Sequence, residues 1–166
     1  MESEGDGPRT AFDVGETPDA AAVTQEEYRE TQLRSSSAER AGERVAEALQ
    51  ELRLHGYQVS RDSDTGDDGT VAHLVSGSTG VFLVEARRGR YENKHLEEAR
   101  RRAEELFHEL DTWVTPVICL AGRSWRGPRR EEKVWIVRRS QIAKWISGRR
   151  NPVLGSEHLP DITAER

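Results

Sequence analysis

An acid and a base stand two residues apart at the end of an apolar run, and no other part of the sequence is better suited to chemistry. The run from Val81 to Val84 is followed by Glu85, Ala86 and Arg87. Alternate side chains of a strand share a face, so Glu85 and Arg87 are predicted to point the same way. Buried charges must pair or hold a ligand. A metal-holding acid beside a base that steadies phosphate is typical of a metal-dependent nuclease, although a simple ion pair would also satisfy both charges.

The elements that must position this pair are two strands joined by a tight turn. An apolar segment from Val71 to Val75 precedes Gly77, and a second segment follows Gly80. Two apolar runs separated by a few small residues predict a hairpin. We expect Ala72 to face the same side as Glu85, roughly 5–8 Å away across the two strands. His73 alternates onto the opposite face.

These residues resemble the nuclease-related domain (NERD) family, a branch of the PD-(D/E)xK nuclease superfamily. The resemblance runs from about residue 41 to residue 148 and starts with Gly42-Glu43 at the opening of a helix. Glu43 and Glu85 match acids of the family. Ala72 stands where the family has a metal-binding Asp, and Arg87 stands where it has Lys.

The resemblance implies an α/β, restriction-endonuclease-like fold, in which a mixed central β-sheet is flanked by helices. It also implies Glu43, Glu85 and Arg87 as catalytic residues, with Glu85 holding Mg²⁺, although spacing alone makes Glu43 a surface residue. Ala72 supplies no carboxylate, and a guanidinium is larger and less adjustable than a Lys amine. We therefore expect impaired or lost phosphodiester cleavage. An active Mg²⁺-dependent nuclease and a non-enzymatic protein-interaction module on the same fold remain alternatives.

Nucleic acid is the expected partner, with DNA favoured. Basic residues gather after the second strand of the pair and in a later loop, where they can contact phosphate. The candidate contacts are Arg88, Arg90, Arg123, Trp125 and Arg126. Solvated charge on a helix face and a mobile loop are an equally good reading of the same residues.

The chain divides into three parts by composition. Residues 1–35 are predicted to form a disordered acidic tail, 36–150 the nuclease-like domain, and 151–166 a C-terminal tail. Residues 1–40 contain ten acids and four bases, a net charge of −6, whereas the whole chain carries −5. The acidity therefore belongs to the N-terminal segment, which offers a surface for a protein partner.

The apolar pattern predicts the order helix, three strands, helix, two strands, helix. A capping box at Ser36 is expected to open the first helix, and Asn93 is expected to cap the second. Asp62 is predicted to be a loop acid. Three of the four tryptophans, Trp113, Trp135 and Trp145, are predicted to be core residues.

Composition narrows the setting of the protein. Hydrophobic residues make up 34% and charged residues 33% of the 166 residues, and no apolar run approaches the roughly 18 residues of a membrane span. The N-terminus lacks the basic and apolar regions of a signal peptide. Cys119 stands alone within an apolar strand, so no intramolecular disulfide can form. We expect a cytoplasmic protein with no membrane partner.

Overall fold

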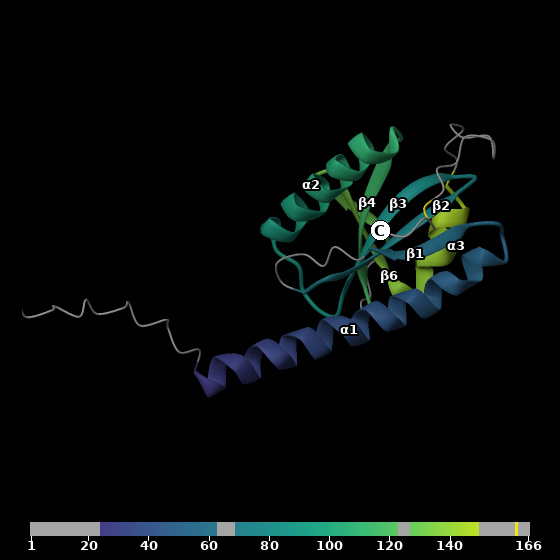
Figure 1. Ribbon diagram of the computed structural model, residues 1–166. Coiled ribbons are helices and arrows are strands. Elements are labelled where there is room, and N and C mark those ends of the chain that lie inside the picture. Colours follow the sequence, from purple (N-terminus) through teal and green to yellow (C-terminus); the bar gives the residue numbers. More distant parts are fainter. Residues whose placement is uncertain (1–23, 63–68, 123–126, 150–161, 163–166) are drawn as a thin grey trace, which may run out of the picture.

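A six-stranded mixed sheet with helices on both faces organises the chain, as Figure 1 shows. The computed structural model describes residues 24–62, 69–122, 127–149 and 162. The elements are α1 (Gln25–Arg53), β1 (Gln58–Asp62), β2 (Val71–Gly77), β3 (Gly80–Arg87), α2 (Asn93–Leu110), β4 (Val114–Leu120), β5 (Arg129–Glu131), β6 (Val134–Arg138), a 3-10 turn η1 (Arg139–Gln141) and α3 (Ile142–Ser147). The predicted fold class, an α/β protein with a mixed sheet between helices, is confirmed.

The sheet combines both kinds of strand pairing in the order β1-β2-β3-β4-β6-β5. The pairs β1–β2 and β2–β3 are antiparallel, the pairs β3–β4 and β4–β6 are parallel, and β5 runs antiparallel to β6. Gly80 has φ +125 at the β2–β3 turn, a backbone conformation that a side chain would strain. The turn therefore fixes the register of the hairpin that carries Glu85.

The two faces of the sheet are covered by different helices. On one face α1 and α3 bury the alternate strand residues Val75, Phe82 and Val84. On the other face α2 packs Ala103 and Leu106 on a second set of strand residues, which comprises Ala72, Leu74, Val81 and Leu83. This alternation is the period-two pattern of strands with both faces buried. Glu85 has the parity of the α2 face.

Helix α1 is longer than the sequence predicts. It begins at Gln25 instead of near Ser36, because Thr24 and Glu27 form a complete capping box. Every residue from Thr24 to Ser36 is exposed, and Figure 1 shows this part of α1 extending beyond the sheet. The predicted domain boundary at residue 35 therefore falls inside a helix. Residues 1–23 of the predicted tail lie outside the described residues.

Single residues at three places in the fold were also predicted from the sequence. Trp113 is 69% exposed, so its assignment to the core is wrong, whereas Trp135 and Trp145 do pack against the core. Ile162, within the predicted C-terminal tail, is buried in the α2-side cluster. Cys119 is buried in β4 as predicted, and that burial raises the pKa of its thiol to about 12.

Candidate functional site

Glu85 is a charged residue in the interior of the protein. It lies on β3 with 0% of its surface exposed. Arg87 lies two residues further on the same face, with its Nη2 atom 3.9 Å from Oε2 of Glu85. The predicted same-face arrangement of this acid and base is therefore confirmed. Because both residues point toward α2, what α2 places above them decides the chemistry.

Ala72 and Asp62 continue the row that Glu85 starts. Ala72 on β2 is the direct register partner of Glu85, and Asp62 on β1 is the direct register partner of Ala72. Residues directly opposite each other in a sheet share a face. The expected position of Ala72 beside Glu85 is confirmed. Asp62, predicted to be a loop acid, instead ends β1 with its side chain buried.

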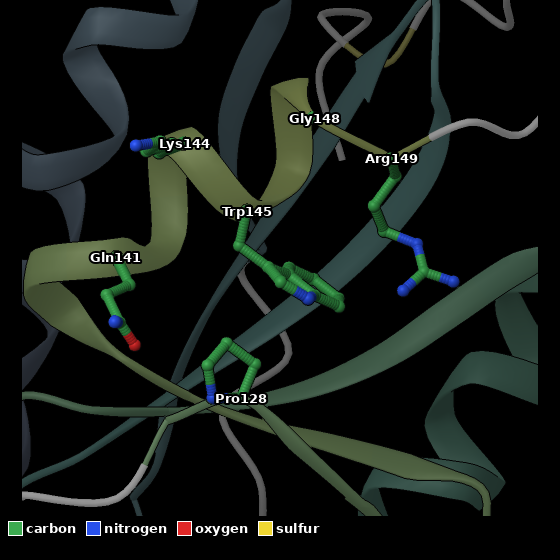
Figure 2. Close-up of a pocket in the computed structure, with 6 residues that line it drawn as sticks. All are labelled: Pro128, Gln141, Lys144, Trp145, Gly148 and Arg149. Carbon is green, nitrogen blue, oxygen red and sulfur yellow. The ribbon is translucent and has the colours of Figure 1, made fainter.

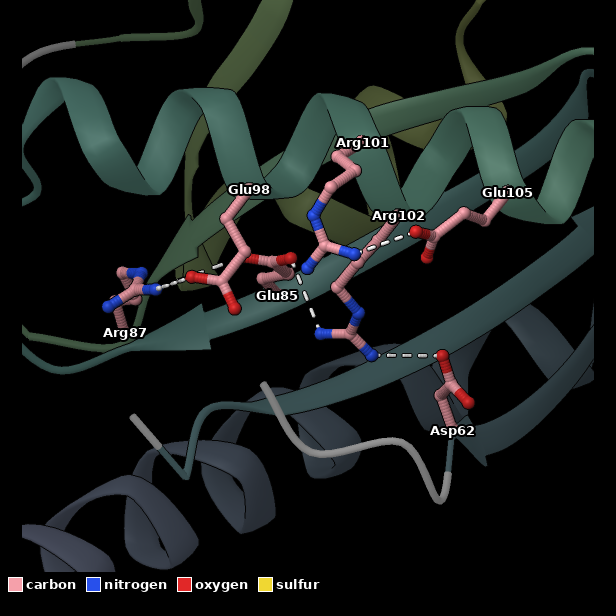
Figure 3. Close-up of polar contacts among 7 residues, drawn as sticks. All are labelled: Asp62, Glu85, Arg87, Glu98, Arg101, Arg102 and Glu105. Carbon is pink, nitrogen blue, oxygen red and sulfur yellow. Dashed lines mark hydrogen bonds and ion pairs between the residues drawn. The ribbon is translucent and has the colours of Figure 1, made fainter. Parts of the chain in front are cut away.

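Arg102 joins the two acids of this row. Its Nη1 atom donates to Oε1 of Glu85 at 3.4 Å, and its Nη2 atom donates to Oδ2 of Asp62 at 3.0 Å. Figure 3 shows the side chain descending from α2 between the two carboxylates. Ala72 occupies the intervening register position with only a methyl group, which leaves room for the guanidinium. Arg102 itself is only 3% exposed.

A second arginine and a second helix acid extend the network. Arg87 Nη2 lies 4.0 Å from Oε2 of Glu98, which comes from α2 (Figure 3). Glu85 is thus shared between Arg87 and Arg102. Such a buried network stabilises a fold only when its charges compensate one another. Here each of the three acids, Asp62, Glu85 and Glu98, lies beside at least one guanidinium group.

The described residues around Glu85 do not fit a divalent metal ion. Mg²⁺ requires about six oxygen ligands in octahedral geometry and retains several waters. Glu85 and Arg102 are closed off from solvent, and Arg102 is a permanent cation that repels a second positive charge. Within the part of the chain that the structure describes, no three His, Cys, Asp or Glu side chains are grouped so that they could hold a metal. Ala72, at the centre of the row, contributes no oxygen.

Glu43 is not brought to this site. It lies on α1 with its side chain exposed, and α1 covers the face of the sheet opposite to Glu85. Its neighbour Gly42 has a structural role, because its carbonyl oxygen lies 3.0 Å from Nε2 of His73. Burial lowers the pKa of that imidazole, which favours the neutral form. As predicted, His73 faces away from Ala72.

The predicted nucleic-acid contacts are only partly described. Arg88 and Arg90 are exposed beyond the end of β3. Arg123, Trp125 and Arg126 lie outside the described residues. Sequence reasoning missed Arg102, although a signal was present: it lies three residues after Ala99 and four before Leu106, on the apolar stripe of α2. A charge on an apolar stripe predicts a buried partner.

The chain matches no protein-family model, no curated protein and no solved structure. Within the described ranges, no helix combines the length and the apolar character needed to cross a bilayer. The functional argument therefore rests on the geometry of the site itself.

Proposed function

We propose that this protein is a NERD-like, nuclease-fold protein that binds nucleic acid without cleaving it. The observation that carries the proposal is the guanidinium of Arg102 between Glu85 and Asp62, above Ala72. In a metal-dependent nuclease, a metal ion held by carboxylates supplies the positive charge at such a position. Here a side chain of the protein supplies that charge.

A guanidinium cannot do the work of the ion that it replaces. A catalytic metal polarises a phosphoryl oxygen and lowers the pKa of a bound water, and both effects need an open coordination position. Arg102 has no such position, is always protonated and is buried. Its donors are directed at Glu85 and Asp62 instead of at a substrate. We infer that the network stabilises the fold and does not activate water.

Binding can outlast the loss of cleavage because it depends on different residues. Phosphate contacts need accessible cations, and Arg88 and Arg90 are exposed directly after the strand that carries Glu85. Arg130 and Lys133 add charge near the edge of the sheet, and the structure describes no ion pair for either of them. These exposed cations support nucleic acid as the partner. The family resemblance favours DNA.

The test combines cleavage and binding in one experiment. The native protein and Glu85→Gln, an uncharged variant of similar shape, are incubated with plasmid and with a labelled single strand in Mg²⁺ and in Mn²⁺. We expect neither protein to cleave either substrate. We also expect the native protein to bind the labelled strand with an affinity that falls as the salt concentration rises. Circular dichroism establishes that Glu85→Gln is folded.

Two results would overturn the proposal. Metal-dependent cutting that disappears in Glu85→Gln would make the protein an active nuclease. Intact substrates without any salt-sensitive binding would remove nucleic acid as a partner and leave a protein-interaction role on the same fold.

A further inference from the structure

Two tryptophans form a platform on the face of the sheet opposite to Glu85. Trp135 of β6 and Trp145 of α3 have ring centroids 5.2 Å apart, and both pack against the α1-side core. The guanidinium carbon of Arg149 lies 4.6 Å from the Trp135 centroid and 4.9 Å from the Trp145 centroid. Cation–π attraction holds a guanidinium in such a position. Arg149 is thus fixed in place by the platform.

A hollow of about 500 Å³ lies beside the platform. Figure 2 shows Trp145 in the middle of this hollow, with Arg149 on one side and Lys144 on the other. The lining residues are Pro128, Gln141, Lys144, Trp145, Gly148 and Arg149. Among the described residues, the lining therefore contains two cations and no acid.

A further cation stands close to Arg149. Arg130 is the register partner of Trp135, so its side chain starts on the same face of the sheet. Burial and the nearby charge of Arg130 both lower the pKa of Arg149. The structure describes no ion pair for Arg130, Lys144 or Arg149. Repulsion between like charges that are held near each other is relieved when an anion binds between them.

We propose that Arg149, on the Trp135–Trp145 platform, together with Arg130 of the neighbouring strand β5, forms a site for a backbone phosphate of the bound nucleic acid. This inference rests on the proposed function and locates its binding surface. Arginine is suited to such a site because its planar fork of donors matches the oxygens of a phosphate. The platform keeps Arg149 ordered, so binding costs little further side-chain entropy.

The position of this site separates binding from the Glu85 network. Trp135 belongs to the α1-side core, whereas Glu85 points toward α2. A strand held at the platform therefore lies on the other face of the sheet from Glu85.

The test compares the two arginines near the platform with the two exposed arginines that follow β3. Arg130→Ala, Arg149→Ala and their double variant are set against Arg88→Ala/Arg90→Ala, and Arg44→Ala controls for the loss of one exposed charge on α1. Binding of a labelled single strand is followed by fluorescence anisotropy over a range of salt concentrations, with inorganic phosphate as a competitor. Each phosphate contact contributes roughly 0.7 to the salt slope for single strands, so the double variant is expected to lose about 1.4.

Arg130 is exposed, so Arg130→Ala alone keeps the test valid if loss of Arg149 loosens α3. We expect it to lower the salt slope by roughly 0.7, with Arg44→Ala unchanged. Binding that falls only in Arg88→Ala/Arg90→Ala would overturn this inference and leave the proposed function intact. A fall in affinity without a change in slope would also overturn it, because no phosphate contact would then be lost. Absence of binding by the native protein would overturn the proposed function itself.

Discussion

Ala72 lies directly opposite Glu85 in the β2–β3 ladder, and Arg102 bridges Glu85 and Asp62, the residues on either side of Ala72 in the row. The row across β1, β2 and β3 thus consists of Asp62, Ala72 and Glu85. Arg102 donates to the acid at each end of the row. An Asp at position 72 would add a third buried carboxylate to this row. The small residue and the buried arginine are therefore two parts of one arrangement.

Loss of Arg102 is expected to be strongly destabilising. Arg102→Ala leaves the carboxylates of Asp62 and Glu85 buried without the cation that joins them. Breaking a buried ion pair from one side costs about 3–5 kcal/mol. Urea unfolding of the variant should show a decrease of this size in the free energy of unfolding.

The neighbouring Arg101 is the matched control for Arg102. It pairs with Glu105 on the exposed side of α2, where a surface ion pair contributes about 0.5 kcal/mol or less. Equal decreases in the free energy of unfolding for Arg101→Ala and Arg102→Ala would show that the buried network stabilises the fold no more than a surface ion pair does.

Gly42 is expected to tolerate no side chain. A Cβ added there would lie 2.6 Å from Cγ1 of Val71, so α1 would have to move away from β2. We expect Gly42→Ala to lower the free energy of unfolding by about 1–3 kcal/mol. Val71→Ala should recover part of that loss in the double variant, because it removes Cγ1 and Cγ2, whereas Cβ, 2.7 Å from the added atom, remains.

Gly89 serves as the control for Gly42. No atom lies within 4 Å of a Cβ added at Gly89, so Gly89→Ala should leave the thermal midpoint nearly unchanged. A large effect at Gly89, or none at Gly42, would contradict the close approach of α1 to β2.

His73 should make stability depend on pH on the acidic side of neutrality. Burial lowers the pKa of the folded imidazole below its unfolded value of about 6.5, so the unfolded chain binds the proton first as pH falls. The stability contributed by the neutral form is complete above about pH 6.5. It is lost as pH falls below that value, by up to about 1.4 kcal/mol per pH unit until the folded pKa is reached.

The pH test is a comparison of unfolding curves for the native protein and His73→Gln, which keeps an amide donor for the Gly42 carbonyl. The difference between the two should shrink as pH falls through this window. A constant difference at every pH would mean that His73 has the same pKa in both states.

Much of the fold followed from the sequence because its signals are local. The alternation around Glu85 predicted the shared face of Glu85 and Arg87, and the hairpin predicted Ala72 beside them. The start of α1 was placed too late because Ser36 and Thr24 both begin acceptable capping boxes. The helix is capped at Thr24 because residues 25–36 are themselves helical. These residues are exposed and have no apolar face, so the sequence gives no periodic signal for that part of the helix.

The contacts within the candidate site were harder to predict from the sequence than the strands that position it. Arg102 is separated from Asp62 by 40 residues, and their contact depends on how α2 crosses the sheet. No short-range pattern encodes that crossing. Trp113 was assigned to the core by residue type, yet it follows the end of α2 and remains exposed. In both cases tertiary packing, and not local preference, decided the outcome.

We propose that Arg102 holds the position that a metal ion takes in an active nuclease. The most direct test of this proposal is titration of the protein with Mn²⁺, followed by electron paramagnetic resonance of the free ion. The samples are the native protein, Glu85→Gln and the triple variant Ala72→Asp/Arg87→Lys/Arg102→Met, with Ala72→Asn in place of Ala72→Asp as the uncharged control.

We expect the native protein to bind no more Mn²⁺ than Glu85→Gln does. The triple variant should bind the ion more tightly than its Ala72→Asn counterpart, because only Asp adds a carboxylate to the row. A stoichiometric Mn²⁺ site in the native protein that disappears in Glu85→Gln would contradict the account, because Glu85 would then hold a metal despite Arg102.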